Sequence, residues 1–127
     1  MQTAVQLYTF DASPLSVTAQ LQAVADAGFD GVEFAGLTVD PGPVRSTLRS
    51  LDLRAPSAHI PLSTLEAGVE SAVAPYRQLG IETVVIPDID RERLQKGTIG
   101  GPAAAVDTVV TELSALGLRP SYHNHTA

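Results

Sequence analysis

Glutamate and histidine side chains stand near the ends of several apolar segments, where a folded chain can bring such groups together. Glu33 interrupts the apolar stretch 31–35, and His59 stands near the end of the stretch 55–60. Near the C-terminus, His123 and His125 are two residues apart. Carboxylates accept protons, and imidazoles bind metals and change charge near neutral pH. These residue types therefore indicate a site for proton transfer or for a divalent metal.

The neighbours of Glu33 predict the direction of its side chain. Successive side chains of a strand point to opposite faces, so Val32 and Phe34 on the covered face turn Glu33 to the other face. A carboxylate is costly to bury without a partner, which favours a functional role over a structural contact with a backbone group or a cation. We predict that Glu33 and His59 are catalytic. The alternative for His59 is a hydrogen bond to a neighbouring loop.

A metal site is predicted from the two histidines near the C-terminus. His123 and His125 share one face of a strand, and with a carboxylate from another strand they can bind a divalent ion. Because the chain has no cysteine, nitrogen and oxygen are the expected donors, which favours Mn, Mg, Fe or Zn. The alternative is that histidines this close to a chain end are only solvated. The polar residues predicted to line the pocket and bind substrate are Gln6, Tyr8 and Asn124.

A sequence motif that recurs along the chain predicts the helices and strands that position these residues. The stretches 27–34, 79–86 and 116–123 each place glycine after an amphipathic run, followed by an apolar residue and a strand. The stretch 51–59 is a weaker copy with Asp52 in place of glycine. Glycine there suits a left-handed helix C-cap. We therefore predict strands at 4–9, 31–35, 55–60, 83–87 and 120–125 and helices at 14–27, 42–51, 63–79 and 101–116.

The alternation of strands and helices predicts an α/β fold with parallel strands and right-handed crossovers. In such folds ligands bind at the carboxyl ends of the strands, where Glu33, His59 and His123 stand. Two architectures fit: a TIM-barrel-derived parallel (β/α) half-barrel of about five strands and four helices, or an open flavodoxin-like sheet. Inward polar residues such as Gln6 favour the half-barrel, because a sheet covered on both faces has apolar strands. The segment 88–101 is predicted to be one long connection, and its charged residues Asp88, Asp90, Arg91, Glu92 and Arg93 are interpreted as a solvated loop.

The composition and net charge of the chain argue against some classes of function. The 127 residues fit one domain, predicted to span 1–127. Eight Lys and Arg stand against fourteen Asp and Glu, a net charge of −6, so the basic surface that binds nucleic acids is not expected. Neither a signal peptide nor an apolar run of the roughly 20 residues that span a bilayer is visible. We expect a cytoplasmic protein without a nucleic-acid or membrane partner.

Three segments, 28–36, 57–61 and 122–125, resemble motifs of the xylose isomerase-like TIM-barrel superfamily and follow one another in the family's order. That superfamily holds sugar phosphate isomerases/epimerases and proteins of the AP endonuclease family 2 type. The resemblance implies a metal-assisted proton transfer on a small carbohydrate. It also implies that Glu33 is the acid of the second strand and His59 the histidine of the third. Many members carry a metal-binding glutamate on the fifth strand, where this chain places His123.

The length of the chain distinguishes it from a complete barrel, which needs about 250 residues. A sheet of about five strands cannot close, and its outer strands have unpaired edges. We expect those edges to be covered in a homodimer, or the chain to correspond to the N-terminal half of a barrel. Two functions follow as hypotheses. One is a sugar isomerase/epimerase that needs dimerisation or a missing C-terminal half; the other is an inactive half-barrel that binds a polyol or another protein.

Overall fold

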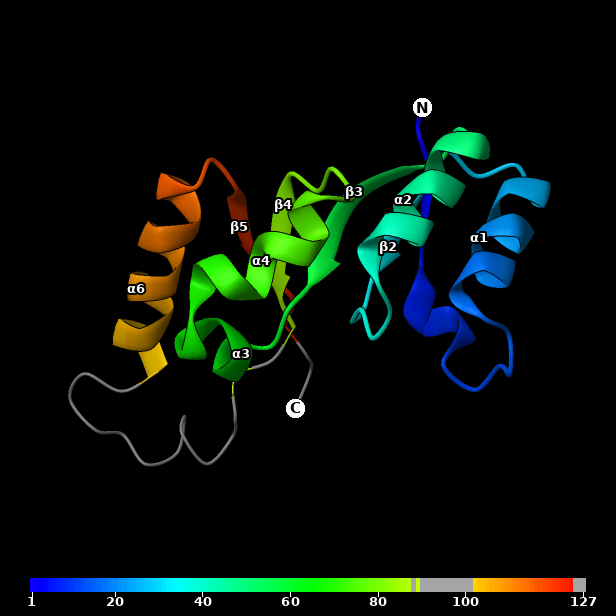
Figure 1. The fold of residues 1–127 in the computed structure, drawn as a ribbon. Coiled ribbons are helices and arrows are strands. Elements are labelled where there is room, and N and C mark those ends of the chain that lie inside the picture. The colour runs from blue at the N-terminus through cyan, green and yellow to red at the C-terminus, as the bar shows by residue number, and fades with distance from the viewer. Residues whose placement is uncertain (88, 90–101, 125–127) are drawn as a thin grey trace.

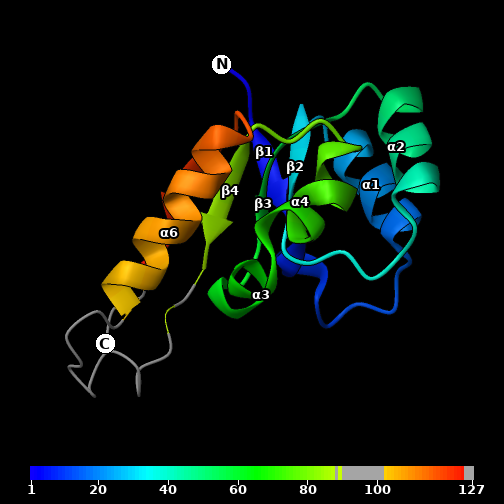
Figure 2. The same ribbon diagram turned by 60° about the vertical axis from the view of Figure 1, so that its left-hand side comes forward.

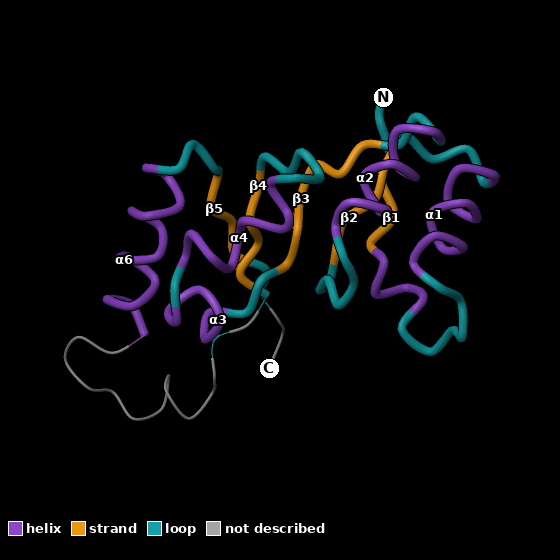
Figure 3. Tube along the Cα trace, in the orientation of Figure 1, coloured by secondary structure: helices purple, strands orange, loops and turns teal. Residues whose placement is uncertain are grey.

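Five strands in the described part of the chain form one parallel sheet. The computed structural model describes residues 1–87, 89 and 102–124. Neighbouring strands are all parallel and lie in the order β1-β2-β3-β4-β5, so that each strand pairs with the next one along the chain. The strands, drawn in orange in Figure 3, are β1 (Ala4–Gln6), β2 (Gly31–Phe34), β3 (Arg54–His59), β4 (Thr83–Ile86) and β5 (Arg119–Tyr122).

The helices connect these strands and lie along one side of the sheet (Figures 1 and 2). Right-handed crossovers between strands that are added in one direction place every helix on the same face. The parallel α/β prediction is confirmed, and the flavodoxin-like alternative is wrong, because that fold adds strands out of sequence order and covers both faces. The helices are η1 (Leu7–Phe10, a 3-10 helix), α1 (Val17–Asp26), α2 (Pro41–Ser50), α3 (Leu62–Ala67), α4 (Val69–Arg77) and α6 (Pro102–Ala115).

The apolar core lies between the sheet and the helices. On β2, Val32 and Phe34 are fully buried on the helix side, which confirms the predicted alternation and turns Glu33 to the uncovered face. The helices contribute buried aliphatic residues such as Leu21 of α1 and Leu113 of α6. The uncovered face carries the polar side chains, so the fold separates its core from its site by the two faces of one sheet.

The glycine of the recurring sequence motif follows the end of a helix, as predicted. Gly28, Gly80 and Gly117 have φ angles of 81°, 87° and 77°, values in the left-handed region that glycine adopts without steric penalty. Asp52, in the weaker copy, has a φ of 54° and is the one positive-φ residue other than glycine among the described residues. Aspartate is one of the few other residues that tolerate this conformation. The positions of the connections between helices and strands could therefore be predicted from the sequence.

The first strand and the first helix are shorter than predicted. The predicted strand 4–9 ends at Gln6, because the chain turns into η1. The predicted start of the first helix at 14 is also wrong, since the helix begins at Val17 with Ser16 as its N-cap. The Ser16 hydroxyl accepts a hydrogen bond from the backbone N–H of Ala19 (3.3 Å), which satisfies one of the free donors of the first turn.

The predicted helix 63–79 is two helices, α3 and α4, that meet at Gly68. The φ of Gly68 is 155°, far from the helical region, so the α-helix cannot continue through it. The predicted fifth strand, 120–125, corresponds to β5; residues 125–127 and most of the predicted loop 88–101 lie outside the described residues. No helix in the described part of the chain is long and apolar enough to cross a membrane.

A register shift in β3 reorients the second half of that strand. Gly31 pairs with Arg54, but Glu33 pairs with Ser57, so β3 has one extra residue between the two pairs. Pro56 lies in this extra stretch. Proline cannot donate to the hydrogen-bond ladder of a sheet and is confined to edges and bulges, so its presence in a central strand matches the shift. The extra residue turns the polar side chains of β3 toward the face that carries Glu33.

The close approach of β2 and β3 also requires glycine. A Cβ atom added to Gly31 would lie 2.6 Å from the backbone oxygen of Arg54, closer than any carbon and oxygen can pack. The obstacle is backbone rather than a flexible side chain, so a larger residue would push the strands apart next to the register shift. Gly31 therefore allows the pairing that brings Glu33 beside the second half of β3.

Candidate functional site

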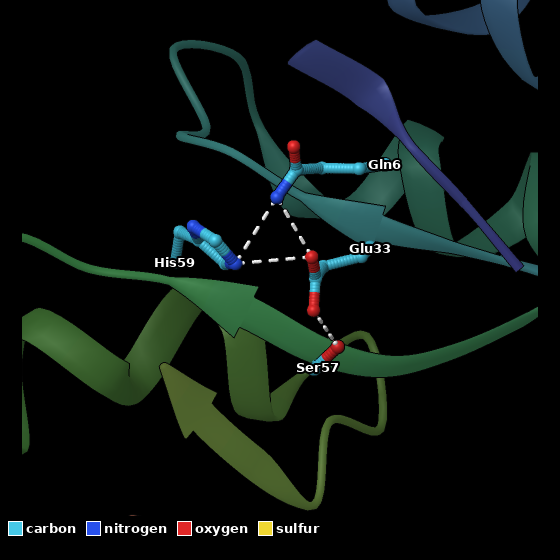
Figure 4. Close-up of polar contacts among 4 residues, drawn as sticks. All are labelled: Gln6, Glu33, Ser57 and His59. Carbon is cyan, nitrogen blue, oxygen red and sulfur yellow. Dashed lines mark hydrogen bonds and ion pairs between the residues drawn. The ribbon is translucent and has the colours of Figure 1, made fainter. Parts of the chain in front are cut away.

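Polar side chains from three neighbouring strands meet on the uncovered face of the sheet (Figure 4). Gln6 is the last residue of β1, Glu33 lies next to the last residue of β2, and Ser57 and His59 lie in the second half of β3. All four stand toward the carboxyl ends of parallel strands, the end at which such sheets bind ligands. The structure thus brings together Gln6, Glu33 and His59, which the sequence indicated, and adds Ser57.

Glu33 is the centre of this group. Its Oε1 accepts a hydrogen bond from the side-chain amide of Gln6 (2.8 Å) and lies 3.0 Å from Nε2 of His59. Its Oε2 accepts a hydrogen bond of 2.6 Å from the Ser57 hydroxyl. Nε2 of Gln6 also lies 3.1 Å from Nε2 of His59. The side chains of His59 and Glu33 are 11% and 24% exposed, so the carboxylate is held by its partners while solvent can still reach it.

The partners of Glu33 are side chains of the same face. In the described part of the chain, Glu33 bonds no backbone group and no lysine or arginine. Its charge is therefore compensated by an imidazole, an amide and a hydroxyl, all of which can donate hydrogen bonds. An acceptor beside a group that exchanges protons, partly open to solvent, is the arrangement that general acid–base chemistry requires.

Ser57 is the member of the site that sequence reasoning missed. Strict alternation along β3 would place Ser57 on the same face as the buried Ala55, and the register shift at Pro56 breaks that alternation. The signal that could have revealed Ser57 is Pro56 itself, because a proline inside a central strand indicates a bulge. Beyond a bulge the inward and outward positions exchange.

His123 lies beside this group, just beyond the end of β5. Its ring packs edge-on against the ring of His59, with 5.4 Å between the centroids. A pocket of about 300 Å³ opens at this place and includes Glu33 and both histidines in its lining. Asn124, predicted to bind substrate, also lines it. The complete lining is Glu33, His59, Val85, Ser121, Tyr122, His123 and Asn124.

A second pocket, of about 540 Å³, shares His59 and His123 with the first. Tyr8, predicted to lie on a strand, instead stands in η1 and forms part of this wall with its ring exposed. Gln6 also lines it, but its amide nitrogen is engaged with Glu33 and His59. The remaining residues of this lining are Ala35, Gly36, Pro61 and Pro87.

A larger hollow, of about 580 Å³, lies at the opposite, amino ends of the strands. Asp30, Arg54 and Glu82 are the charged residues of its lining, and none of the polar residues of the site reaches it. The amino ends of strands serve stability in parallel α/β folds, whereas chemistry is carried at the carboxyl ends. The two pockets around His59 therefore remain the candidate site.

The metal site predicted from the sequence is not assembled by the described residues. Among residues 1–87, 89 and 102–124, no three His, Asp or Glu side chains are grouped so that they could hold a metal ion. His125, one of the two predicted ligands, lies outside the described residues. His59 and His123 supply two imidazoles, and Glu33 is already engaged with His59. The described residues alone therefore do not assemble a metal site, and the chemistry below uses no metal.

The side chain of Tyr76, in α4, lies beside the loop that follows β2. Its side chain forms a hydrogen bond with the backbone of Leu37, next to Ala35 and Gly36 of the pocket wall. Burial raises the pKa of Tyr76 above its usual value of 10.0, and the hydrogen bond with Leu37 offsets part of that rise. The neutral phenol is therefore the form that suits the folded state.

The raised pKa of Tyr76 predicts a loss of stability at alkaline pH. A group whose pKa is higher in the folded state contributes fully below its unfolded pKa, near 10.0, and this contribution is lost as the pH rises further. We expect the free energy of unfolding, measured by urea denaturation, to fall from pH 9 to pH 11. In Tyr76→Phe this fall should be smaller, whereas Tyr8→Phe, whose ring is exposed, should behave as the wild type. Equal slopes for all three proteins would contradict the prediction.

Comparison with known proteins identifies the fold. No family model matches the chain, and no curated protein matches it. Several solved structures share its fold. A sugar phosphate isomerase/epimerase from Parabacteroides distasonis has a TM-score of 0.72 at 17% identity, over 98% of this chain and 51% of that one.

Two further structures extend the comparison. An AP endonuclease of family 2 from Brucella melitensis has a TM-score of 0.71 at 17% identity, over 96% of this chain and 55% of that one. D-psicose 3-epimerase, solved in the presence of D-fructose, has a TM-score of 0.65 at 15% identity, over 99% and 55%. The chain thus spans about half the length of the solved structures that it matches. Its fold is that of about half of a xylose isomerase-like TIM barrel.

Proposed function

We propose that this protein carries an isomerase/epimerase-type site, which moves a proton on a small carbohydrate. The observation that supports it is the pair of Glu33 and His59, 3.0 Å apart at the carboxyl ends of β2 and β3. A carboxylate and an imidazole in contact can accept and return one proton without net change. The pair opens onto pockets of about 300 and 540 Å³, which suit a ligand of the size of a monosaccharide.

The chemistry needs one acid–base group and a carbonyl in the substrate. The pair removes a proton from the carbon next to the carbonyl: the C–H bond breaks, and its electrons pass into an enediolate. Return of a proton to the neighbouring carbon, while the hydroxyl proton moves from one oxygen of the enediolate to the other, exchanges an aldose and a ketose. Delivery of a proton from solvent water to the opposite face of the first carbon inverts its configuration, which is an epimerisation, and the pair then releases its own proton to solvent. In both cases the pair ends in its initial protonation state.

A carbohydrate is preferred to a nucleic acid as the substrate. Two of the solved structures described above are named for sugar isomerisation or epimerisation, and one is named as an AP endonuclease. Because the identities are 15% to 17%, these names identify a fold and not a reaction. The net charge of −6 weakens any attraction to a phosphate backbone. The net charge of the chain and the Glu33–His59 pair therefore both support a carbohydrate substrate.

Proton exchange with solvent tests this proposal directly. Aldoses and ketoses of five and six carbons, with and without phosphate, are incubated with the protein in D₂O and followed by ¹H NMR. We expect at least one of them to lose the signal of the C–H next to its carbonyl, because the pair exchanges the abstracted proton with solvent. Retention of every such C–H signal at high protein concentration would remove the proposal.

One alternative function is a binding module without catalysis. The chain spans about half the length of the solved structures that it matches, and this supports the binding module. A barrel-type active site takes residues from many strands. Light scattering and calorimetry distinguish the two. A monomer that binds a polyol and exchanges no protons supports the module, and an exchanging homodimer joined through its sheet edges supports the enzyme.

The predicted metal and the predicted cytoplasmic location stay predictions. The metal concerns His123 and His125, and titration with Mn²⁺ in a calorimeter, repeated with His123→Ala, tests it independently of turnover. Heat of binding that is present in the wild type and absent in the variant would establish the ligand. Fractionation of the producing cells tests the location.

A further inference from the structure

Three atoms of the site form a triangle in which each lies within hydrogen-bonding distance of the other two. Nε2 of Gln6, Oε1 of Glu33 and Nε2 of His59 are separated by 2.8, 3.0 and 3.1 Å. The amide nitrogen of Gln6 carries two hydrogens and accepts none. A neutral imidazole carries one hydrogen, on one of its two nitrogens. The position of the hydrogen on His59 therefore decides which sides of the triangle are hydrogen bonds.

The carboxylate of Glu33 selects that position. If the hydrogen of His59 were on Nδ1, the lone pairs of Nε2 and Oε1 would face each other at 3.0 Å, which is repulsive beside a negative charge. With the hydrogen on Nε2, His59 donates to Oε1, and Gln6 donates to the same oxygen. The nitrogens of Gln6 and His59 are then close only because both donate to Oε1 of Glu33, and they form no hydrogen bond with each other.

Nδ1 of His59 is left with its lone pair. Every hydrogen bond and ion pair of His59 with the described residues goes through Nε2. No side-chain nitrogen or oxygen in the described part of the chain is both buried and without a partner, so Nδ1 is reachable from solvent. His59 lines both pockets. In Figure 4 its second ring nitrogen lies on the side of the ring away from Glu33.

We propose that the atom that transfers the proton is Nδ1 of His59, and that Glu33 is the positioning residue that holds His59 as the Nε2–H tautomer. This proposal rests on the function proposed above. The lone pair of Nδ1 forms the new N–H bond, while the C–H bond of the substrate breaks and its electrons enter the enediolate. The imidazolium formed is stabilised by the Glu33 carboxylate; its Nδ1 proton can exchange with solvent, and Nδ1 then returns a proton to the product.

Gln6 and Ser57 are positioning residues that hold Glu33 in turn. A carboxylate offers about four lone-pair sites, and His59, Gln6 and Ser57 occupy three of them. The bond from Ser57, at 2.6 Å, has the short length of a bond to a charged acceptor. The two donors fix the carboxylate from both of its oxygens, so that Oε1 faces the ring of His59 in one orientation.

Nitrogen-15 NMR of the neutral imidazoles reads the tautomer without any substrate. The chain has three histidines, so His59→Gln identifies the signals of His59. We expect one tautomer, with the hydrogen on Nε2 in slow exchange with water. In Glu33→Ala, which removes the acceptor, we expect a mixture of tautomers and faster exchange. A wild-type protein with the hydrogen on Nδ1 would overturn the proposal.

Variants of Ser57 test the second part. Ser57→Ala should speed the exchange of the Nε2 hydrogen and lower kcat by about ten- to a hundredfold with little change in KM, because the loosened carboxylate no longer orients His59. Ser57→Thr keeps the hydroxyl and should restore both. Ser50→Ala removes an exposed hydroxyl of α2 that bonds the backbone of Thr47 and makes no bond to Glu33, so it should leave the exchange unchanged. Unchanged exchange in Ser57→Ala would contradict the positioning role.

The two proposals fail in different ways. Turnover of a sugar by a protein whose His59 carries its hydrogen on Nδ1 would overturn this inference and leave the proposed function intact. Complete absence of proton exchange into every sugar would overturn both. Turnover together with the Nε2–H tautomer and the loss in Ser57→Ala supports both.

Discussion

Replacing Glu33 by glutamine should lower the rate of proton transfer by about two to four orders of magnitude, the usual contribution of general acid–base catalysis, because the transfer by His59 depends on Glu33. The amide has one oxygen, so it cannot accept from Gln6, Ser57 and His59 as the carboxylate does. It also loses the charge that stabilises the imidazolium. KM should change little, because Glu33 acts through His59. The measurement is the initial rate of C–H exchange in D₂O, for the sugar that the wild type turns over.

A matched control separates this effect from a general loss of negative charge. Glu82 is 76% exposed and pairs with Arg119 at 3.2 Å on the surface, an arrangement that contributes little to stability. Glu82→Gln should retain the wild-type rate. A Glu33→Gln protein that exchanges protons as fast as Glu82→Gln would show that Glu33 has no part in the transfer.

Replacing Phe34 by alanine should reduce the free energy of unfolding by about 3–5 kcal/mol, as expected when a fully buried phenylalanine leaves a cavity. Phe34 is 1% exposed and lies on the helix face of β2. It is also the residue after Glu33, so its packing fixes the end of the strand that presents the carboxylate. Urea denaturation followed by circular dichroism measures the change.

Phe29 provides the control for this prediction. It has the same side chain but is 39% exposed, in the joint between α1 and β2. Phe29→Ala should lower the free energy of unfolding by about 1 kcal/mol or less, because partly exposed positions leave no closed cavity. Equal losses in the two variants would mean that the face assigned to the core is wrong.

The arrangement of the sheet could be predicted because local signals repeat. Gly28, Gly80 and Gly117 each occupy the left-handed position that ends a helix, and the strands follow at once. Val32 and Phe34 fixed the direction of Glu33 by simple alternation. Nothing in these inferences needed contacts between distant parts of the chain, since each depends on the conformational preferences of a few adjacent residues.

The details that the sequence did not predict depend on tertiary contacts. The apolar residues on both sides of Gly68 continue the spacing of one helix, although the backbone breaks there. The polar cluster also needed the register of two strands. Ser57 reaches Glu33 only because β3 has an extra residue at Pro56, and alternation counted along a single strand cannot show a shift relative to its neighbour.

The bonds around Glu33 were beyond sequence reasoning for a related reason. Gln6 was predicted to bind substrate, since it stood on the same face and at the same end as Glu33. Its substrate contact stays a prediction, and its amide also donates to Oε1 of Glu33 at 2.8 Å, a bond that the sequence did not indicate. Whether a polar side chain meets a ligand or a neighbour depends on separations of about an ångström, which residue types and spacing do not determine.

The order of the strands has a consequence for how this chain folds. Because every strand pairs with the next one in the sequence, each new pair closes only the stretch of chain between two consecutive strands, and the entropy lost in closing a loop grows with its length. No strand has to be inserted between two that are already paired. Assembly can begin at any adjacent pair and spread outward in both directions, as in repeat proteins whose units contact only their neighbours.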